Sequence, residues 1–379
     1  MKNLAVFYGG NSCEKDISII TALQAMDAAD KTKYKIYPIY FTDCFILPDE
    51  YNKVETYAKA TPPNGKRLVL NGRELYAVKK SKLKKLADID CALLCAHGGC
   101  GENGALQGFL EIHNIPYTSP GVLASAVGMD KAVCKMICRR LSLPVLPYGT
   151  IYEGESESAL AKIVARIGFP MIVKPAKQGS SIGISICKDD AELEENLKVA
   201  FNYDKKVVIE KALTNFKEIN CACVKIKDKI YPSTLEEPVG WQDFLTFEDK
   251  YMSNCGKITK ASAKRIYPAK LSENDTAKIQ FMTSKLYSAL ECKGIVRCDF
   301  LLDSDSGEVY LNEINTVPGS LAGYLYEDRD IKLKDIIDIV VDEAIKDARE
   351  NKSFVYSSKV LQYYAKNNAN ACKTSLKTV

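Results

Sequence analysis

Three oxygen-bearing side chains near the end of the chain have the types and spacing of a cation site. Asp299 lies in one short apolar run, at 298–302, and Glu313 and Asn315 follow a second, at 308–311. An Asp-Ser-Gly turn joins the runs and predicts a β-hairpin. Residues two apart share a face of a strand, and Asp299 would meet them there from the partner strand. Two carboxylates and an amide are oxygen ligands that magnesium takes beside nucleotide phosphates, although a solvated hairpin is an alternative interpretation.

A second candidate is a glycine- and serine-rich segment, KPAKQGSSIG at 174–183, which follows a buried apolar run. Its glycines and serines would let backbone and hydroxyl donors surround a phosphate, and Lys174 would supply charge. The segment lacks the spacing of the P-loop of nucleotide-binding proteins. A hairpin turn without function is the alternative.

Three further segments carry polar residues of interest. Glu210 and Lys211 end a strand beside Leu213 and suit the edge of a nucleotide base, or a solvated strand end. His97 opens a glycine-rich run before a helix, although a buried structural histidine has the same pattern. Glu14, near the start of the first helix, would also fit its polar face. None of these segments specifies a function alone.

Strands that alternate with helices predict an α/β fold with a parallel sheet at the N-terminus. A strand at 3–8 runs through two glycines into a helix at 17–26, which leaves backbone N–H groups aimed at a ligand. Residues 45–85 are expected to be irregular, with a break at 62–65. The other elements expected in this region are strands at 34–40, 89–95 and 115–117 and helices at 104–113 and 121–141.

The later elements would hold the candidate residues near strand ends. A polar segment at 240–264, long for a loop in a compact enzyme, predicts a lid. A helix at 273–291 leads into the hairpin, and a polar tail follows a last helix at 332–349. The other expected strands are at 147–151, 171–174, 182–187, 206–210, 218–225 and 229–232, with helices at 155–167 and 190–202.

Composition excludes several classes of protein. The 379 residues are 46% apolar and 26% charged, with a dispersed net charge of +4, so no nucleic-acid footprint is present. The densest basic run, at 79–85, is interpreted as a solvated loop or helix face. No apolar stretch is long enough for a membrane span or a signal segment, which predicts a cytoplasmic protein. The 14 cysteines lack C-x-x-C spacing and are expected to be reduced and mostly buried.

The order and spacing of several segments together resemble the D-alanine–D-alanine ligases of the ATP-grasp superfamily. These segments are GGNSCEKDIS, HGGCGENGALQG, MDK, KPAKQGSSIG, IEKAL, DKY, RCDF and NEINTVPG. The resemblance runs over about residues 3–345. It implies a three-domain ATP-grasp architecture, with a Rossmann-like α/β domain at 1–119 and two α+β domains at 120–210 and 211–349 that clasp ATP. The tail at 350–379 has no counterpart in the resemblance.

For the nucleotide, the resemblance implies lysines at the phosphates and acidic residues at the base and ribose. Asp299, Glu313 and Asn315 match the ligands of magnesium or manganese, usually two ions, in agreement with the hairpin site. The residues that match ATP-binding positions are Lys131 and Lys174 for the phosphates, Glu210 for the adenine amine, Lys211 and Leu213 beside the ring, Glu218 for the ribose, and Lys250 in the lid for the transferred phosphate.

For the first substrate, the resemblance implies contacts from the N-terminal domain, the Gly-Ser segment and the lid. Glu14 matches the residue that takes the ammonium of the first D-alanine, with Ser180 and Tyr251 as hydrogen-bonded partners. His97 matches a histidine near the carboxylate of the same substrate.

The second substrate's site is where the chain departs from the family. Arg297 and the backbone of Gly319 match the groups that hold the acyl phosphate and the second substrate's carboxylate. The family then runs M/F-T-S-H-S, whose last serine helps to bind that carboxylate, but here Tyr324 stands in its place, before Leu325. A phenol would donate from a different distance, or Ser320 would substitute.

The reaction implied is ATP-dependent ligation of two D-alanines to D-alanyl-D-alanine through an acyl phosphate, for peptidoglycan precursors. Two alternatives stay open: a relative that takes D-serine or another second D-amino acid, and a non-catalytic ATP-binding relative. Tyr251, where depsipeptide-forming relatives carry other residues, favours an amine over a hydroxy acid. The resemblance also implies a homodimer, and the composition indicates neither nucleic-acid nor membrane partners.

Overall fold

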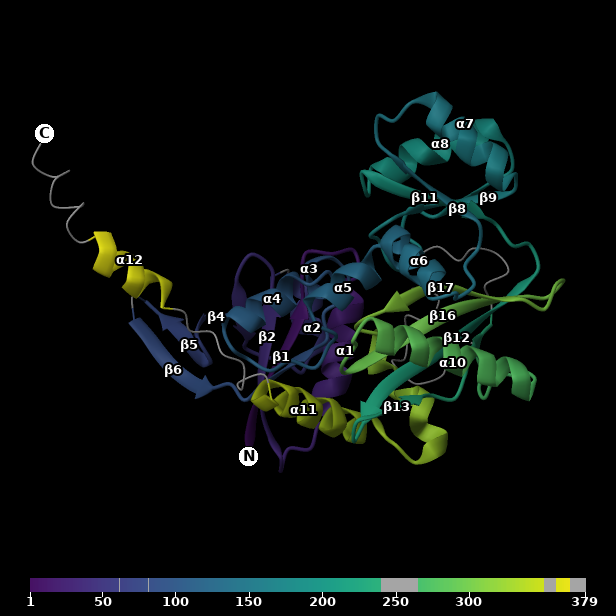
Figure 1. Ribbon diagram of the computed structural model, residues 1–379. Helices are drawn as coiled ribbons and strands as arrows, with labels where there is room; N and C mark the ends of the chain where they lie inside the picture. Colours follow the sequence, from purple (N-terminus) through teal and green to yellow (C-terminus); the bar gives the residue numbers. More distant parts are fainter. Residues whose placement is uncertain (61, 81, 240–264, 351–358, 369–379) are drawn as a thin grey trace, which may run out of the picture. The chain divides into compact units, whose positions relative to one another are not determined.

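Mixed and antiparallel β-sheets succeed one another along the chain (Figure 1), and their strands carry Lys174, Glu210 and Asp299 among the candidate residues. They are seen in a computed structural model that describes residues 1–60, 62–80, 82–239, 265–350 and 359–368. Met1–Ile345 forms one compact unit, and Lys346–Val379 forms a second. The division of the first unit into domains at 119 and 210 stays a prediction.

The first sheet joins the predicted parallel strands to an antiparallel extension. Its elements are β1 (Lys2–Gly9), α1 (Lys15–Ala28), β2 (Tyr34–Phe41), β3 (Phe45–Pro48), α2 (Val54–Lys59), β4 (Gly65–Asn71), β5 (Glu74–Lys79), β6 (Lys82–Asp88) and β7 (Cys91–Leu94). β1 runs parallel to β2 and β7, as predicted. The expectation that 45–85 is irregular is wrong, because this segment adds β3 to β6 as antiparallel strands. Most side chains of β4 and β6 are exposed, so these strands lack the apolar alternation that marks a strand in a sequence.

Most lysines of the basic run at 79–85 lie on two strands, and not on a loop or helix face as predicted. Lys79 ends β5, and Lys82, Lys84 and Lys85 belong to β6. β6 is the last strand in the order of the sheet, and these lysines are exposed. Lysines along an edge strand discourage pairing with the edge of another sheet.

Short helices connect the first sheet to the second. They are α3 (Gly99–Glu102), α4 (Ala105–Ile112), α5 (Val122–Met129) and α6 (Lys131–Arg140). The strand predicted at 115–117 is only an isolated bridge between Ala92 and Tyr117. The helix predicted at 121–141 is broken at Asp130, whose carboxylate caps α6 by accepting from the N–H groups of Ala132 and Val133 at 3.1 Å. Lys131 therefore begins α6.

The second sheet is antiparallel and supports two helices on one face. Its strand order is β10 (Ser185–Cys187), β9 (Met171–Pro175), β11 (Lys206–Lys211) and β8 (Tyr148–Tyr152), and its helices are α7 (Glu157–Ile167) and α8 (Asp190–Phe201) (Figure 1). Ile163 and Leu197 of the helices pack against Val173 and Ile209 of the strands. β10 is shorter than predicted, because the N–H groups of Ile182 and Ile184 donate back to Gly179 and Ser181 in turns, and Gly183 takes a left-handed φ of +68°.

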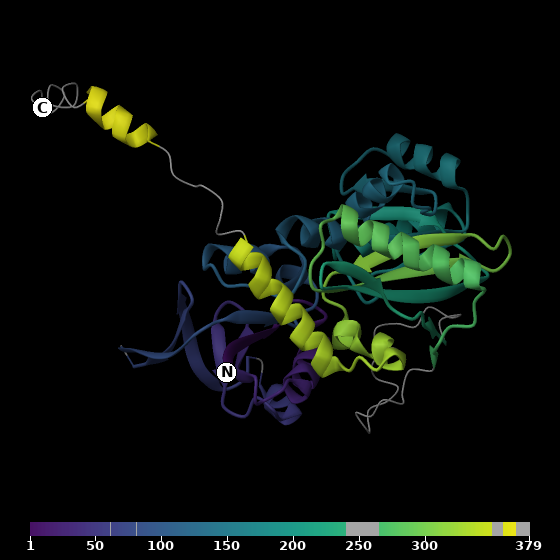
Figure 2. The ribbon, with the colours of Figure 1, turned by 60° about the horizontal axis from the view of Figure 1, so that its bottom comes forward.

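The third sheet is antiparallel and contains the predicted hairpin. Its strand order is β13 (Lys229–Pro232), β12 (Phe216–Ile226), β16 (Ile295–Asp303) and β17 (Val309–Asn315). Across one face lies α10 (Glu273–Ala289), which packs through Ile279, Met282 and Leu286 (Figure 2). After the hairpin, η1 (Gly319–Arg329) and α11 (Leu333–Glu350) return to the first sheet, where Ile337 and Val341 join its core.

β14 (Glu237–Pro238) and β15 (Arg265–Ile266) form a two-stranded antiparallel sheet. In the sequence, these strands precede and follow residues 240–264. The predicted lid at 240–264 lies outside the described residues. In the second unit, the polar tail contains α12 (Val360–Asn368), a helix that its composition did not predict. Among the described residues, none of the helices combines the length and the apolar composition that a bilayer span requires.

The cysteines of the described residues are unpaired and mostly buried, as expected. Cys134, Cys221, Cys223 and Cys298 share the core beneath α10. Burial raises the pKa of Cys221 to about 11. These side chains therefore act as small apolar groups in the folded chain.

Gly294, just before β16, is expected to tolerate no side chain. Its φ is +65°, and an added Cβ would lie 1.9 Å from the backbone oxygen of Thr118. Gly307, in the hairpin turn, has a similar φ of +72° but nothing within 4 Å of an added Cβ. Alanine at Gly307 should therefore cost only the left-handed strain of about 1–2 kcal/mol. Gly294→Ala should lower the free energy of unfolding by about 1–3 kcal/mol more than this, since the backbone at Thr118 or Gly294 must move to relieve the clash.

Urea unfolding of the two variants beside the unmodified protein measures both losses. Equal losses would contradict the proposed clash.

Candidate active site

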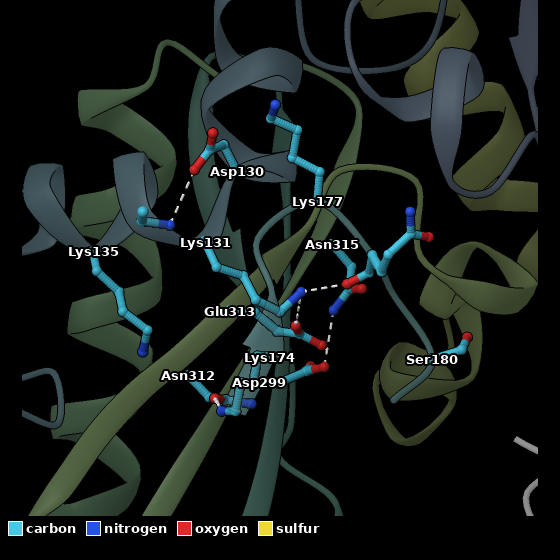
Figure 3. A network of polar contacts seen from close by, with 12 residues as sticks. Asp130, Lys131, Lys135, Lys174, Lys177, Ser180, Asp299, Asn312, Glu313 and Asn315 are labelled. Carbon is cyan, nitrogen blue, oxygen red and sulfur yellow. Dashed lines mark hydrogen bonds and ion pairs between the residues drawn. The ribbon is translucent and has the colours of Figure 1, made fainter. Parts of the chain in front are cut away.

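The hairpin places its polar side chains on one face, as the spacing predicted. Asp299 on β16 pairs with Glu313 on β17, and Arg297 pairs with Asn315. Asn315 Nδ2 donates to Asp299 Oδ2 at 2.8 Å. A bulge in β17 turns Asn312 toward Lys174, whose Nζ donates to Asn312 Oδ1 at 3.1 Å (Figure 3). Asn312 was not predicted, although it begins the NEIN segment.

Each carboxylate on this face has a cation beside it. Arg297 donates twice to Asp299, from Nε to Oδ1 at 2.6 Å and from Nη2 to Oδ2 at 2.8 Å. Glu313 Oε2 lies 3.1 Å from Lys131 Nζ (Figure 3). Burial raises the pKa of Asp299, and Arg297 opposes that rise. The face is therefore charged but nearly balanced.

These residues fit a hard divalent cation by the chemistry of their donors. Asp299 and Glu313 supply carboxylate oxygens, and Asn315 uses its nitrogen on Asp299, which leaves its amide oxygen for a ligand. Within the described residues, no group of three or more His, Cys, Asp and Glu side chains could hold a metal, so a softer site has no counterpart there. Magnesium or manganese suits this set.

A buried carboxylate joins two lysines next to this face. Glu210 on β11 is fully buried, with Oε2 2.8 Å from Lys135 Nζ and Oε1 bound by Lys174. The contact with Lys135 is an ion pair that is not aligned as a hydrogen bond. Burial opposes ionisation, but the two ammonium groups lower the pKa of Glu210 to about 2. An adenine contact by Glu210, predicted from the resemblance, would have to share these oxygens.

Lys135 is a site residue that the sequence interpretation missed. It lies four residues after Lys131 on α6, and its side chain is 1% exposed. The i,i+4 spacing after MDK was the available signal, because it places both lysines on one helix face.

The Gly-Ser segment connects the hairpin to the first helix. Lys131 Nζ donates to the backbone oxygen of Gln178 at 2.6 Å, and Ser180 donates to Glu14. A Cβ at Gly179 would lie 2.6 Å from a Glu14 carboxylate oxygen, so a side chain there would have to displace that carboxylate. The structure thus brings together Glu14 and Ser180, which the resemblance had paired.

His97 is held inside the protein by two neighbouring segments. Its Nε2 lies 2.8 Å from Thr21 Oγ1, which also accepts from the backbone N–H of Ser320 at 3.1 Å. Burial lowers the pKa of His97 to about 4, so the imidazole is neutral at pH 7. In this structure His97 supports the turn after Gly319, and Thr21 is a connecting residue that the sequence did not indicate.

Glu102 ties the glycine-rich run to the segment after the hairpin. Its carboxylate accepts from the N–H groups of Gly98 at 2.8 Å and Val317 at 2.9 Å. Burial, followed by the charge of Glu14, raises the pKa of Glu102 to about 7. This residue was also missed, although it lies within HGGCGENG.

The remaining predicted residues occupy diverse surroundings. Lys211 donates to the backbone oxygens of Gly168 and Phe169 at 3.2 and 2.8 Å. Leu213 and Glu218, which follow in the sequence, are partly buried. Leu325 is fully buried. Lys250 and Tyr251 lie outside the described residues.

The turn that carries the second substrate's predicted contacts has an unusual backbone. Ser320, Leu321 and Ala322 take consecutive left-handed φ values of 52°, 50° and 44°. Tyr324 follows, and its Oη donates to Glu236 Oε1 at 2.8 Å. The hydroxyl at this place is therefore engaged by the protein.

Comparison with solved structures identifies the architecture. The D-alanine–D-alanine ligase from Helicobacter pylori matches with a TM-score of 0.73 and 31% identity, covering 89% of this chain and 98% of its own. The VanG D-Ala:D-Ser ligase from Enterococcus faecalis matches with a TM-score of 0.77 and 25% identity, over 90% and 99% of the two chains. The arrangement of the sheets is therefore the ATP-grasp fold, which is found in ATP-dependent ligases.

Sequence comparison then gives the family. Its models match as D-ala D-ala ligase N-terminus over residues 3–120 and D-ala D-ala ligase C-terminus over residues 137–372. The D-alanine–D-alanine ligase of Thermosipho africanus is 35% identical over 363 residues, covering 94% of this chain and 97% of that protein. The chain belongs to the D-alanine–D-alanine ligase family. The C-terminal match reaches into the tail, which the resemblance had left without a counterpart.

Removal of the Glu102 charge should change how stability depends on pH. A free glutamate ionises near 4.5, and the pKa of Glu102 is raised to about 7. As pH rises between these values the unfolded chain loses its proton first, so the unmodified protein loses stability over this window. Glu102→Gln should lack that loss.

Urea unfolding of both proteins at about pH 5 and about pH 8 provides the comparison. If the free energy of unfolding changed equally between the two pH values in both proteins, Glu102 would not titrate in this way.

Replacement of Lys135 by the apolar, similarly long methionine should weaken ATP binding. Glu210 would keep only Lys174 as a partner, and the tighter ion pair would hold Lys174 away from a phosphate. We expect the KM for ATP to rise about tenfold, the loss typical of one charge-assisted contact.

Lys162→Met, at an exposed lysine of α7, is the matched control. An unchanged KM for ATP in folded Lys135→Met would limit Lys135 to a structural role.

Proposed function

We propose that this protein joins D-alanine to a second D-amino acid with ATP, for the synthesis of peptidoglycan precursors. The observation that carries the proposal is that Lys131 and Arg297 contact the carboxylates of Glu313 and Asp299, while Lys174 binds Asn312 on the same strand as Glu313. A protein that only bound a nucleotide would not need phosphate-side cations and a cation-binding face together. The non-catalytic alternative is therefore less well supported.

The reaction is written in two steps. The γ-phosphoryl group of ATP passes to a carboxylate oxygen of the first D-alanine, and ADP leaves. The amine of the second amino acid then attacks the acyl carbon, a C–N bond forms, the C–O bond to phosphate breaks, and the amine loses a proton. Phosphate is released with the dipeptide, so the energy of ATP converts a poor acyl donor into a reactive one.

The residues near the first substrate have separable roles. Glu14, fixed by Ser180, would bind the ammonium of the first D-alanine. Lys131 and Lys174 would bind phosphate oxygens, which would replace their present protein partners, Gln178 and Asn312. Arg297 and the backbone N–H of Gly319 would stabilise negative charge on the acyl phosphate and the tetrahedral intermediate.

Asp299, Glu313 and Asn315 would hold magnesium or manganese, in one or two ions. When bound, the metal neutralises charge on the transferring phosphoryl group. Lys250 and Tyr251 of the predicted lid remain proposals from the resemblance. A homodimer in the cytoplasm is likewise proposed from the family.

The second substrate is proposed to be D-alanine, the substrate that the names of the relatives give. D-serine is the second candidate, because Tyr324 replaces the serine of the family and one structural relative is a D-Ala:D-Ser ligase.

Phosphate release from Mg-ATP tests the function directly. We expect turnover with D-alanine alone and a dipeptide identified by mass. Turnover only in mixtures with D-serine, D-lactate or glycine would move the second-substrate assignment to the acid found in the product. ATP binding without turnover in any mixture would favour the non-catalytic alternative.

A variant of the cation face accompanies this assay. Glu313→Gln should lower kcat by about 10²-fold or more, because the charge opposite Lys131 and the metal is lost. Glu308→Gln, in the exposed part of the same hairpin, should retain activity. Full activity of Glu313→Gln, with an unchanged circular dichroism spectrum, would contradict the metal role.

A further inference from the structure

Glu236, a buried carboxylate outside the proposed machinery, organises the residues around Tyr324. It is 4% exposed and lies just before β14. Tyr324 Oη donates to Oε1 at 2.8 Å, and Asn220 Nδ2 donates to the same oxygen at 3.2 Å. Arg265 Nη1 contacts Oε2 at 3.4 Å. One carboxylate therefore fixes a phenol, an amide and a guanidinium together.

This arrangement removes Tyr324 as a donor to substrate. Its only hydroxyl proton points to Glu236, so the phenol offers lone pairs to anything else. A substrate carboxylate, which only accepts hydrogen bonds, cannot bind there as it would to a serine hydroxyl. Another cation or donor must take over that contact.

Arg265 is the group placed to do so. Its guanidinium lies 4.6 Å from the centre of the Tyr324 ring and 5.4 Å from that of Tyr267, so two aromatic faces and Glu236 orient it. Its side chain is 33% exposed, and Glu236 is its one ion-pair partner among the described residues. A guanidinium has five N–H donors in a fixed fork that suits a carboxylate.

Asn220 supplies a second, independent sign of a ligand. It is 4% exposed, and within the described part of the chain its Oδ1 has no hydrogen-bond partner. The amide orientation is fixed, because Glu236 can only accept and so takes the nitrogen side. Asn220 pairs with Asp299 across β12 and β16, so it shares the face of the proposed metal site. A buried acceptor without a partner is costly unless a donor from elsewhere completes it.

We propose that Arg265 binds the carboxylate of the second substrate and that Asn220 Oδ1 accepts a hydrogen bond from its amine. This inference rests on the ligase activity proposed above and assigns the second-substrate site to residues that no motif of the chain indicated. Asn220 contacts Oε1 of Glu236 and Arg265 contacts Oε2. This one carboxylate therefore sets the distance between the groups that would bind the amine and the carboxylate of an α-amino acid. The amine, held through one N–H, keeps its lone pair free for attack.

A competition between an amino acid and its amide isolates the carboxylate contact. D-Alanine and D-alaninamide, at equal concentrations, compete as second substrates, and the two products are quantified by mass. If the unmodified protein takes another second acid, that acid and its amide are used with D-alanine. The product ratio reports the ratio of kcat/KM values. We expect the unmodified protein to favour the free acid by about tenfold or more, the range of one charged hydrogen bond.

Arg265→Met should bring this ratio close to one while leaving the KM for ATP unchanged. Arg265→Lys, which keeps a cation without the fork, should give an intermediate ratio and serves if the methionine variant does not fold. Asn220→Leu should lower kcat/KM for acid and amide alike, since both carry the amine. Arg140→Met, at an exposed arginine of α6, is the control and should keep the original ratio.

An unchanged ratio in folded Arg265 variants of an active enzyme would overturn this inference alone. Absence of turnover by the unmodified protein with every pair would overturn the proposed function and this inference with it.

Discussion

The site depends on keeping charged side chains ionised in a space from which most water is excluded. Glu210 lies between Lys135 and Lys174, Glu313 faces Lys131, and each pair spans two elements of the fold. A carboxylate or an ammonium buried alone in such a place would change its protonation state. Because these lysines and glutamates rely on partners from other segments, α6, the second sheet and the hairpin must assemble together for them to remain charged.

The same constraint prepares the site for an anionic substrate. Lys131 and Lys174 are already fixed by protein oxygens before a nucleotide arrives. Cations held in place need little rearrangement to meet a phosphate, and electrostatic stabilisation is most effective when it is arranged beforehand. The backbone of the Gly-Ser segment, which meets Glu14 closely at Gly179, brings the first-substrate residues to the same place.

Local sequence patterns predicted those parts of the molecule that depend on neighbours in the chain. The shared face of Asp299, Glu313 and Asn315 follows from the two-residue period of a strand, and the early parallel strands follow from their apolar runs. Lys135, Glu102 and Thr21 were missed because their importance arises from distant partners. The strands within 45–85 were missed because their exposed side chains conceal the alternation.

The buried cysteines have a consequence for the chain once it leaves its native state. In the folded protein, Cys134, Cys221 and Cys298 are shielded within one apolar core and held in their protonated form. Unfolding exposes them together to oxygen and to one another, and thiolates then form mixed disulfides that no longer match the native fold. Reversibility of unfolding is thus tied to the redox state of the solution, and in air the lifetime of the protein is a matter of kinetics.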